Sequence, residues 1–524
     1  MSSDLNVTHL QHMWAEDAGA TSPVRMPMMS GAGVFFRKWA ILCHRWLGVA
    51  LCVLFAMWFV SGIVLMYWTY PGVGLQDRLL RAEPLDASRV RLSPAEAYAR
   101  LESTEPPTQA RLAMFDGRPA YRFEFRDVAF LVYADNGQIQ DDFPRDWALR
   151  VASAWTRQPA ASARFEGAIT RPDQWTVSGE FNALRPLWKF SWPDGEEVYV
   201  SQATGEVEQY TTRASRIGAY FGAIPHWLYF TPLRKNGLAW NRTVVWSSAV
   251  GTGMTIFGLV VGLLLYSPSE KRYRFPSGRS SVPYAGYKRW HTILGLFFGL
   301  VTCTWVFSGM LSMEPFDWQS DVGPAGRIAR ALRGGALPIS RFHSPAEVFR
   351  EAAPVKQLDL TTVAGEPVYL ARQSSDRSLI IPMQAPPASE VDPGRLTSIV
   401  ARAAGPYQLA ETRIVRQYES YYVDRHHERP LPVLFIRLND PENSMYYIDL
   451  KTGRLVAAYA TGARWSRWLY HGLHSIDLPW LYRHRPAWDI AVLALMLGGT
   501  ALAVTSLVIA WHRLRFKLAA AFRS

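Results

Sequence analysis

Two stretches of this chain of 524 residues match each other at a constant spacing of 247 positions. The matched residues are His44 with His291, Gly48 with Gly295, Trp58 with Trp305, Ser61 with Ser308, and Gly62 with Gly309. A long self-match at one fixed offset predicts an internal duplication. Each histidine stands near the start of an apolar stretch, so the repeat predicts two equivalent membrane-spanning helices with a histidine at the same end.

Four apolar stretches are long enough to cross a bilayer, which needs about 20 residues. The predicted spans are residues 37–68, 243–267, 288–314 and 487–512. Lys and Arg gather before the first span, in the basic linker 268–287 and in the segment 513–524. Because cytoplasmic loops carry the excess of positive charge, these clusters predict that both termini are cytoplasmic. Residues 1–36 are expected to form a flexible cytoplasmic tail.

The overall charge and the cysteines exclude several classes of protein. The formal net charge is +12, which in a chain with four spans is explained by positive cytoplasmic loops and does not predict nucleic-acid binding. The three cysteines, Cys43, Cys52 and Cys303, all lie in predicted spans and have no CxxC spacing. We therefore expect neither a disulfide framework nor a thiolate metal site.

The two long segments between the spans have the patterns of soluble domains. Each contains a Ser-Pro-Ala-Glu helix start, at Ser93 and Ser344, followed by short strands. Each also contains a strand that runs into a Thr-Gly turn, and the glycines of these turns, Gly205 and Gly453, are 248 positions apart. The duplication is therefore predicted to include the soluble segments.

The predicted fold class is an α-helical membrane protein. Four transmembrane helices form a duplicated two-helix unit, with two periplasmic α+β domains that each place a helix on an antiparallel sheet. The domains are expected at residues 69–215 and 315–463. The segments that follow them, 216–242 and 464–486, are rich in Trp, Tyr and Arg and have the composition of a membrane interface.

Each half of the chain supplies two histidines near the bilayer boundaries. His44 and His291 start the first and third spans, whereas His226 and His474, 248 positions apart, precede the second and fourth. Ionisable residues at such depths are rare and usually functional. If the halves pack about a pseudo-twofold axis, the two histidines of each pair converge near that axis. Two facing imidazoles are what a low-spin b-type haem requires as axial ligands. The pattern predicts two haems b, one near each membrane face.

Two further histidines are alternative ligands. His471 lies three residues before His474, so on a helix it shares the same face and is an alternative ligand or a propionate contact. His512 ends the fourth span on the cytoplasmic side and is an alternative member of the inner pair. Arg45 and Arg289 are candidates for contacts to haem propionates, or alternatively are positive anchors of the cytoplasmic face.

These motifs, twice over and in the same order, resemble the PepSY-associated transmembrane proteins. The likeness rests on His44-Arg45-Trp46-Leu47-Gly48 with the Trp58…Ser61-Gly62 that follows, the Ser-Pro-Ala-Glu helix starts, the Thr-Gly turns, and Trp468-Leu469-Tyr470-His471-Gly472-Leu473-His474. Some members of that family are bacterial inner-membrane ferric-siderophore reductases with two haems b. The resemblance therefore implies periplasmic PepSY domains on a four-helix core in the bacterial inner membrane. It also implies that His44, His291, His226 and His474 bind haem iron.

The function that we expect is haem-dependent electron transfer across the membrane. The periplasmic acceptor is expected to be ferric iron in a siderophore, which places the protein in iron uptake. The cytoplasmic segments contain no Gly-rich dinucleotide fingerprint, so the donor is expected to be a quinol or a separate cytoplasmic reductase. One alternative is a membrane-anchored periplasmic binding or regulatory module without redox activity. Another is a transporter, which only the duplication favours.

Overall fold

The computed structural model describes residues 31–125, 128–268, 273–276, 278–316, 323–348, 354–424 and 428–521. The chain divides into two compact units. The helical unit comprises Met1–Tyr70, Gly218–Phe316 and Trp468–Ser524, and the sheet unit comprises Pro71–Ile217 and Asp317–Arg467. Residues 1–30 of the expected cytoplasmic tail lie outside the described residues.

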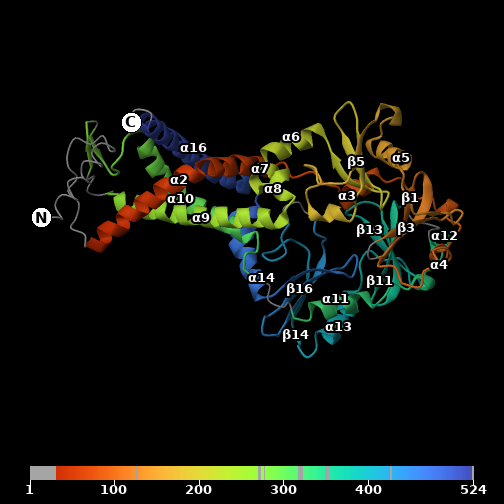
Figure 1. Cartoon of the computed structure of the whole chain (residues 1–524). Coiled ribbons are helices and arrows are strands. Elements are labelled where there is room, and N and C mark those ends of the chain that lie inside the picture. The colour runs from red at the N-terminus through yellow and green to blue at the C-terminus, as the bar shows by residue number, and fades with distance from the viewer. Residues whose placement is uncertain are drawn as a thin grey trace. The chain divides into compact units, whose positions relative to one another are not determined.

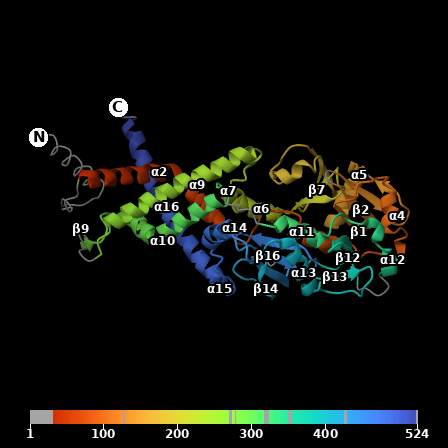
Figure 2. The same cartoon turned by 90° about the horizontal axis from the view of Figure 1, so that it is seen from below.

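Four long helices build the helical unit: α2 (Gly31–Leu65), α9 (Gly237–Leu265), α10 (Gly286–Leu311) and α16 (Ala487–Ala521). Each contains a stretch long and apolar enough to cross a membrane, which confirms the prediction of four candidate spans. Each helix packs against two neighbours, in the order α2, α9, α10, α16 and back to α2 (Figures 1 and 2). The helices α2 and α10, which contain the repeated histidine motif, therefore lie across the bundle from each other.

Short elements connect these helices. In the first half, α6 (Arg213–Phe221), α7 (Ala223–Trp227) and α8 (Thr231–Arg234) precede α9. In the second half, α14 (Thr461–Ser466), the π-helical turn η5 (Arg467–Gly472) and α15 (Pro479–Tyr482) precede α16. The basic linker contains a small hairpin of β9 (Tyr273–Phe275) and β10 (Gly278–Ser280). The predicted interfacial segments therefore fold as short helices that lead into the second and fourth spans.

The two long segments share one antiparallel sheet of seven strands, in the order β13-β12-β11-β1-β2-β3-β4. The first segment gives β1 (Gln109–Phe115), β2 (Arg118–Glu124), β3 (Ala129–Tyr133) and β4 (Ile139–Gln140), and the second gives β11 (Gln357–Val363), β12 (Glu366–Arg372) and β13 (Ser378–Pro382). The two sets join where β1 pairs with β11, with Ala110 opposite Leu360. Instead of two separate domains, the segments therefore form one compact unit.

Each long segment also builds a four-stranded antiparallel sheet of its own. One has the order β5-β6-β7-β8 and the other β14-β15-β16-β17. Their strands are β5 (Arg164–Ile169), β6 (Leu187–Ser191), β7 (Glu197–Ser201) and β8 (Val207–Thr211), and β14 (Leu409–Val415), β15 (Val433–Leu438), β16 (Met445–Asp449) and β17 (Leu455–Tyr459). The helix α5 (Arg145–Thr156) packs on the first of these sheets, and α13 (Pro393–Ala404) packs on the second. The expected combination of helix and antiparallel sheet is present in each segment.

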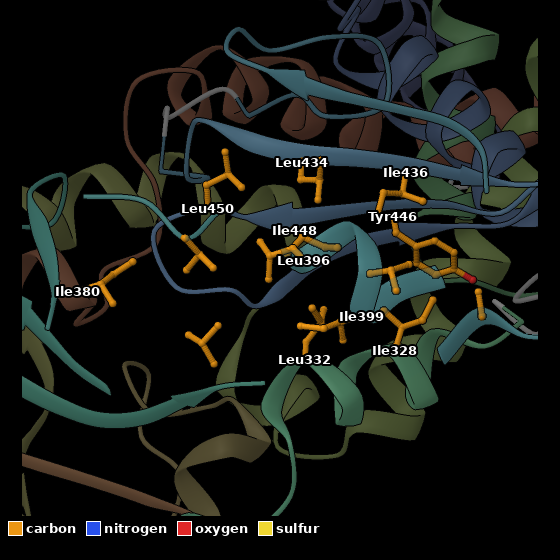
Figure 3. Close-up of a cluster of buried hydrophobic side chains, with 14 of the residues drawn as sticks. Ile328, Leu332, Ile380, Leu396, Ile399, Leu434, Ile436, Tyr446, Ile448 and Leu450 are labelled. Carbon is orange, nitrogen blue, oxygen red and sulfur yellow. The ribbon is translucent and has the colours of Figure 1, made fainter. Parts of the chain in front are cut away.

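Local sequence signals account for the helix starts in the sheet unit. The helix α4 (Pro94–Ala99) begins where predicted, because Ser93 accepts the backbone N–H of Glu96, whose carboxylate accepts that of Ser93. The helix α12 (Pro345–Val348) starts at the second Ser-Pro-Ala-Glu motif. In Figure 3, side chains from β15 and β16 meet those of α13 and α11 (Ala325–Arg333) in a buried apolar core. This core holds the second four-stranded sheet on its helices.

Candidate histidine-pair site

The helical unit brings the four repeated histidines together as two pairs. His44 on α2 faces His291 on α10, with ring centres 6.0 Å apart and ring planes inclined by 34°. His226 on α7 faces His474, just after η5, with ring centres 6.1 Å apart and planes inclined by 61°. We call these the inner pair and the outer pair. Both pairs join one histidine from each half of the chain.

The separation within each pair fits two ligands of one metal ion. An imidazole nitrogen lies about 2 Å from a metal that it binds and about 1 Å from its own ring centre. Two imidazoles on opposite sides of one ion therefore have ring centres about 6 Å apart, close to the 6.0 and 6.1 Å of the two pairs. The donor set in each pair, two imidazoles and no carboxylate, fits the axial ligands of a haem.

Hydrogen bonds fix the outer histidines through the repeated Trp…Ser motif. Nδ1 of His226 lies 3.2 Å from the carbonyl oxygen of Trp58 and 3.3 Å from Oγ of Ser61. Nδ1 of His474 lies 3.1 Å from the equivalent carbonyl of Trp305 and 3.1 Å from Oγ of Ser308. A carbonyl oxygen only accepts hydrogen bonds, so Nδ1 carries the proton in both rings. The lone pair needed for a metal then resides on Nε2.

The inner histidines reach the same tautomer by different partners. Nδ1 of His44 donates to the carbonyl oxygen of Met254 on α9, at 3.0 Å. Nδ1 of His291 lies 3.2 Å from Oγ1 of Thr505 and 3.3 Å from Oγ of Ser506, both on α16. Both hydroxyls donate to the carbonyl of Leu502. They therefore accept from Nδ1 of His291, and Nε2 again holds the lone pair.

Glycines lie beside three of the four rings, and Gly258 makes room for one of them. A Cβ atom at Gly258 would lie 2.5 Å from Cε1 of His44, closer than carbon atoms approach. A Cβ at Gly62 would lie 3.2 Å from Cε1 of His226, and one at Gly309 would lie 3.4 Å from Cε1 of His474. Other glycines, such as Gly251 beside Phe55, serve helix packing instead. The serine of each Ser-Gly dipeptide thus contacts an outer imidazole, and the glycine lies beside the same ring.

Two tryptophans tie down the chain that follows the outer histidines. Nε1 of Trp240 on α9 donates to the carbonyl of Trp227, directly after His226, at 2.7 Å. Nε1 of Trp488 on α16 donates to the equivalent carbonyl of Ser475, directly after His474, at 3.2 Å. The spacing of 14 residues between each histidine and its tryptophan therefore places the indole N–H against the carbonyl that follows the histidine.

The two alternative histidines are both exposed in the structure. His471 is exposed at the end of η5, and its ring lies 4.6 Å from that of Tyr470. His512 is exposed on α16, six residues beyond Ser506, the neighbour of His291. In the described part of the chain, no group of three or more His, Cys, Asp and Glu side chains could hold a bare metal ion. The two histidine pairs are therefore the candidate site.

Several residues that hold the histidines were not assigned this role by the sequence reasoning. Ser61 and Ser308 belong to the repeat, and their constant spacing from His44 and His291 was a usable signal. Thr505 and Ser506 carry no such signal, because the position that matches Ser506 is Gly258. The contact of His44 with the backbone carbonyl of Met254 cannot be predicted from a sequence pattern, since every residue has a carbonyl. These partners could be found only once the helices were packed.

Residues 41–513 match the profile of a known protein family, described as the PepSY-associated TM region. The matched range contains both histidine pairs and both long segments that form the sheet unit. No curated protein matches this chain.

Proposed function

Because the chain belongs to the family described as the PepSY-associated TM region, we propose that it is a di-haem electron-transfer protein of the bacterial inner membrane. It passes electrons from the cytoplasmic or quinol side to a periplasmic acceptor. The observation that carries the proposal is the spacing of 6.0 and 6.1 Å within the two histidine pairs. We also propose that the two halves are copies of one two-helix unit, since residues 247 or 248 positions apart make equivalent contacts.

The histidine pairs are suited to binding one haem b near each membrane face. His44 and His291 would hold the inner haem, and His226 and His474 the outer haem. From His44 to Ser61, the partner of His226, α2 rises by about 25 Å at about 1.5 Å per residue, close to the thickness of a hydrocarbon core. A bis-histidine haem supplies a one-electron carrier. The chain itself supplies neutral imidazoles, fixed in one tautomer, inside an apolar bundle.

We propose ferric iron in a siderophore as the acceptor, with both termini cytoplasmic and the sheet unit in the periplasm. Four spans place both long segments on the same side, and the basic clusters favour the other side as cytoplasmic. One electron converts ferric to ferrous iron, which hard oxygen chelators bind less tightly. A quinol or a separate reductase is proposed as the donor.

The visible spectrum of the detergent-purified protein tests this function. We expect a Soret band that shifts on reduction with dithionite, and a haem content of two per chain. Reoxidation of the reduced protein by a ferric siderophore would support the proposed acceptor. A colourless protein, expressed with adequate haem supply, would instead favour an anchored binding or regulatory module.

Replacing Gly258 with alanine should disturb the inner pair alone. The new Cβ would overlap the ring of His44, whose Nδ1 is held by Met254, so the ring cannot retreat without losing that bond. We expect substantial loss of one haem, measured by absorbance per chain. Gly253→Ala, on the same helix α9, is the matched control, because a Cβ at Gly253 would have no neighbour within 4 Å. Full haem content in Gly258→Ala would contradict this role of Gly258.

A further inference from the structure

Four aromatic residues cluster around the chain that follows His226. Tyr70, Trp227, Tyr229 and Trp240 form this outer aromatic cluster, and all belong to the helical unit. The ring centres of Trp227 and Tyr229 are 5.3 Å apart, and those of Tyr229 and Trp240 are 5.4 Å apart. Since Trp227 follows His226 and is tied to Trp240 by the indole hydrogen bond, the cluster is fixed to the outer pair.

Arg234, at the end of α8, places its guanidinium on this cluster. Its Cζ lies 5.0 Å from the ring centre of Tyr229 and 4.4 Å from that of Trp240. Its Nε is buried and has no hydrogen-bond partner within the described residues, and no carboxylate of those residues forms an ion pair with it. A buried donor without a partner costs about 1–3 kcal/mol, and more when it is charged. Such a group can bind an anion that the described residues do not provide.

In the second half of the chain, a guanidinium from a different position of the repeat stacks on the matching tryptophan and is neutralised. Arg485 stacks on Trp488, the match of Trp240, with Cζ 4.6 Å from the ring centre. However, Arg485 is also paired with the carboxylate of Asp489 at 2.5 Å. The two outer tryptophans therefore each carry a guanidinium, but only the one in the second half has its own carboxylate. Of these two guanidiniums, only that of Arg234 lacks a carboxylate partner among the described residues.

We infer that Arg234 binds a carboxylate of the group held between His226 and His474, which under the proposed function is a propionate of the outer haem. Haem b carries two propionates, and a guanidinium binds a carboxylate through two parallel hydrogen bonds. The unpaired Nε is buried, which favours an anion held inside the protein over a lipid phosphate at the surface. The cation–π contacts hold the guanidinium in place before the anion is bound. This inference rests on the proposed function.

The midpoint potential of the outer haem tests the inference. We expect Arg234→Gln to lower this potential, because removal of a nearby positive charge destabilises the reduced, less positive state. The potential of the inner haem, read in the same optical redox titration, should stay unchanged. Arg234→Lys keeps the charge but not the two parallel bonds, so we expect a smaller lowering. Arg485→Gln/Asp489→Asn is the matched control, because it removes a guanidinium and its paired carboxylate together, and it should leave both potentials at their wild-type values.

The possible outcomes separate this inference from the proposed function. If the wild-type protein binds no haem, the proposed function fails. If the wild-type protein binds two haems and either folded Arg234 variant keeps the outer potential, the inference is overturned. A variant that loses thermal stability or bound phospholipid while its outer potential is unchanged would assign Arg234 to packing or to lipid phosphate, which also overturns it.

Discussion

Alanine at His44 or His291 should remove one of the two haems, and alanine at His226 or His474 should remove the other. Each single variant is expected to retain about half of the wild-type haem absorbance per chain. The reason is that each histidine faces only its own partner, at 6.0 Å in the inner pair and 6.1 Å in the outer pair. Loss of one axial imidazole leaves a haem held by a single ligand in an apolar bundle. Haem content and low-temperature difference spectra measure the result.

The pattern among the four variants is more informative than the loss itself. Two variants of one pair should share a spectrum, and the two pairs should give complementary spectra that add up to that of the wild type. The double variant His44→Ala/His291→Ala should look like either of its single variants. By contrast, His44→Ala/His226→Ala should be nearly colourless, because it damages both sites. Any other grouping would mean that the pairs in the structure are not the ligand pairs.

His471 and His512 provide the controls. Both are exposed, whereas the structure pairs His44 with His291 and His226 with His474. Alanine at either position should therefore leave two haems with unchanged spectra. Loss of the outer haem in His471→Ala, with full retention in His474→Ala, would move the ligand role to His471. Loss of the inner haem in His512→Ala would similarly reassign the inner pair.

The sequence alone predicts the histidine pairing because the repeat has a constant spacing. Equivalent residues of a duplicated unit meet when its copies pack about an axis, so His44 and His291 were expected to face each other. Their ligand role stays a prediction. The hydrogen-bond partners of the rings were harder to predict. Nδ1 of His44 contacts a backbone carbonyl, whereas Nδ1 of His291 contacts the hydroxyls of Thr505 and Ser506. A choice between a carbonyl and a hydroxyl depends on how the helices are packed.

The shared sheet could not be predicted for a different reason. Strands that are close in sequence usually pair with each other, so each long segment was expected to complete its own sheet. The strand β1 does pair with β2, but its other edge pairs with β11, more than 240 residues later. The alternating pattern of β1 fits any neighbour, and its partner is set by packing in the assembled unit. Glu206, directly after Gly205 of the first Thr-Gly turn, likewise has contacts that the sequence does not predict.

Replacing Glu206 with glutamine should strongly destabilise the sheet unit. Its carboxylate accepts hydrogen bonds from Arg111 on β1 and from Arg78 on α3 (Leu75–Arg81), the latter at 3.3 Å. Nη1 of Arg122 on β2 lies 3.8 Å from Oε1 of Glu206. Glu206 therefore connects its own four-stranded sheet to the shared sheet. Its removal leaves three guanidiniums with two carboxylates, Glu124 and Glu208, and an uncompensated buried charge typically costs about 3–5 kcal/mol.

The pKa of Glu206 gives the sign of the pH dependence. Burial opposes ionisation, but the attraction of Arg111, Arg122 and Arg78 outweighs it and lowers the pKa from 4.5 to about 2. A lowered pKa contributes stability that is fully present above the unfolded value and is lost as pH falls toward the folded value. The difference between wild type and Glu206→Gln should be greatest above pH 5 and shrink toward pH 2.

Glu208 is the matched control, because it lies two residues away and shares Arg78, at 2.9 Å. Burial and the repulsion from Glu206 raise its pKa, so its charged form is disfavoured and a neutral glutamine should cost far less. Thermal unfolding of the full-length protein in detergent measures both variants. We expect the midpoint to fall by about 5 °C or more for Glu206→Gln, and by clearly less for Glu208→Gln. Equal shifts would show that the two carboxylates act only through Arg78, and that the contacts of Glu206 with the shared sheet add no stability.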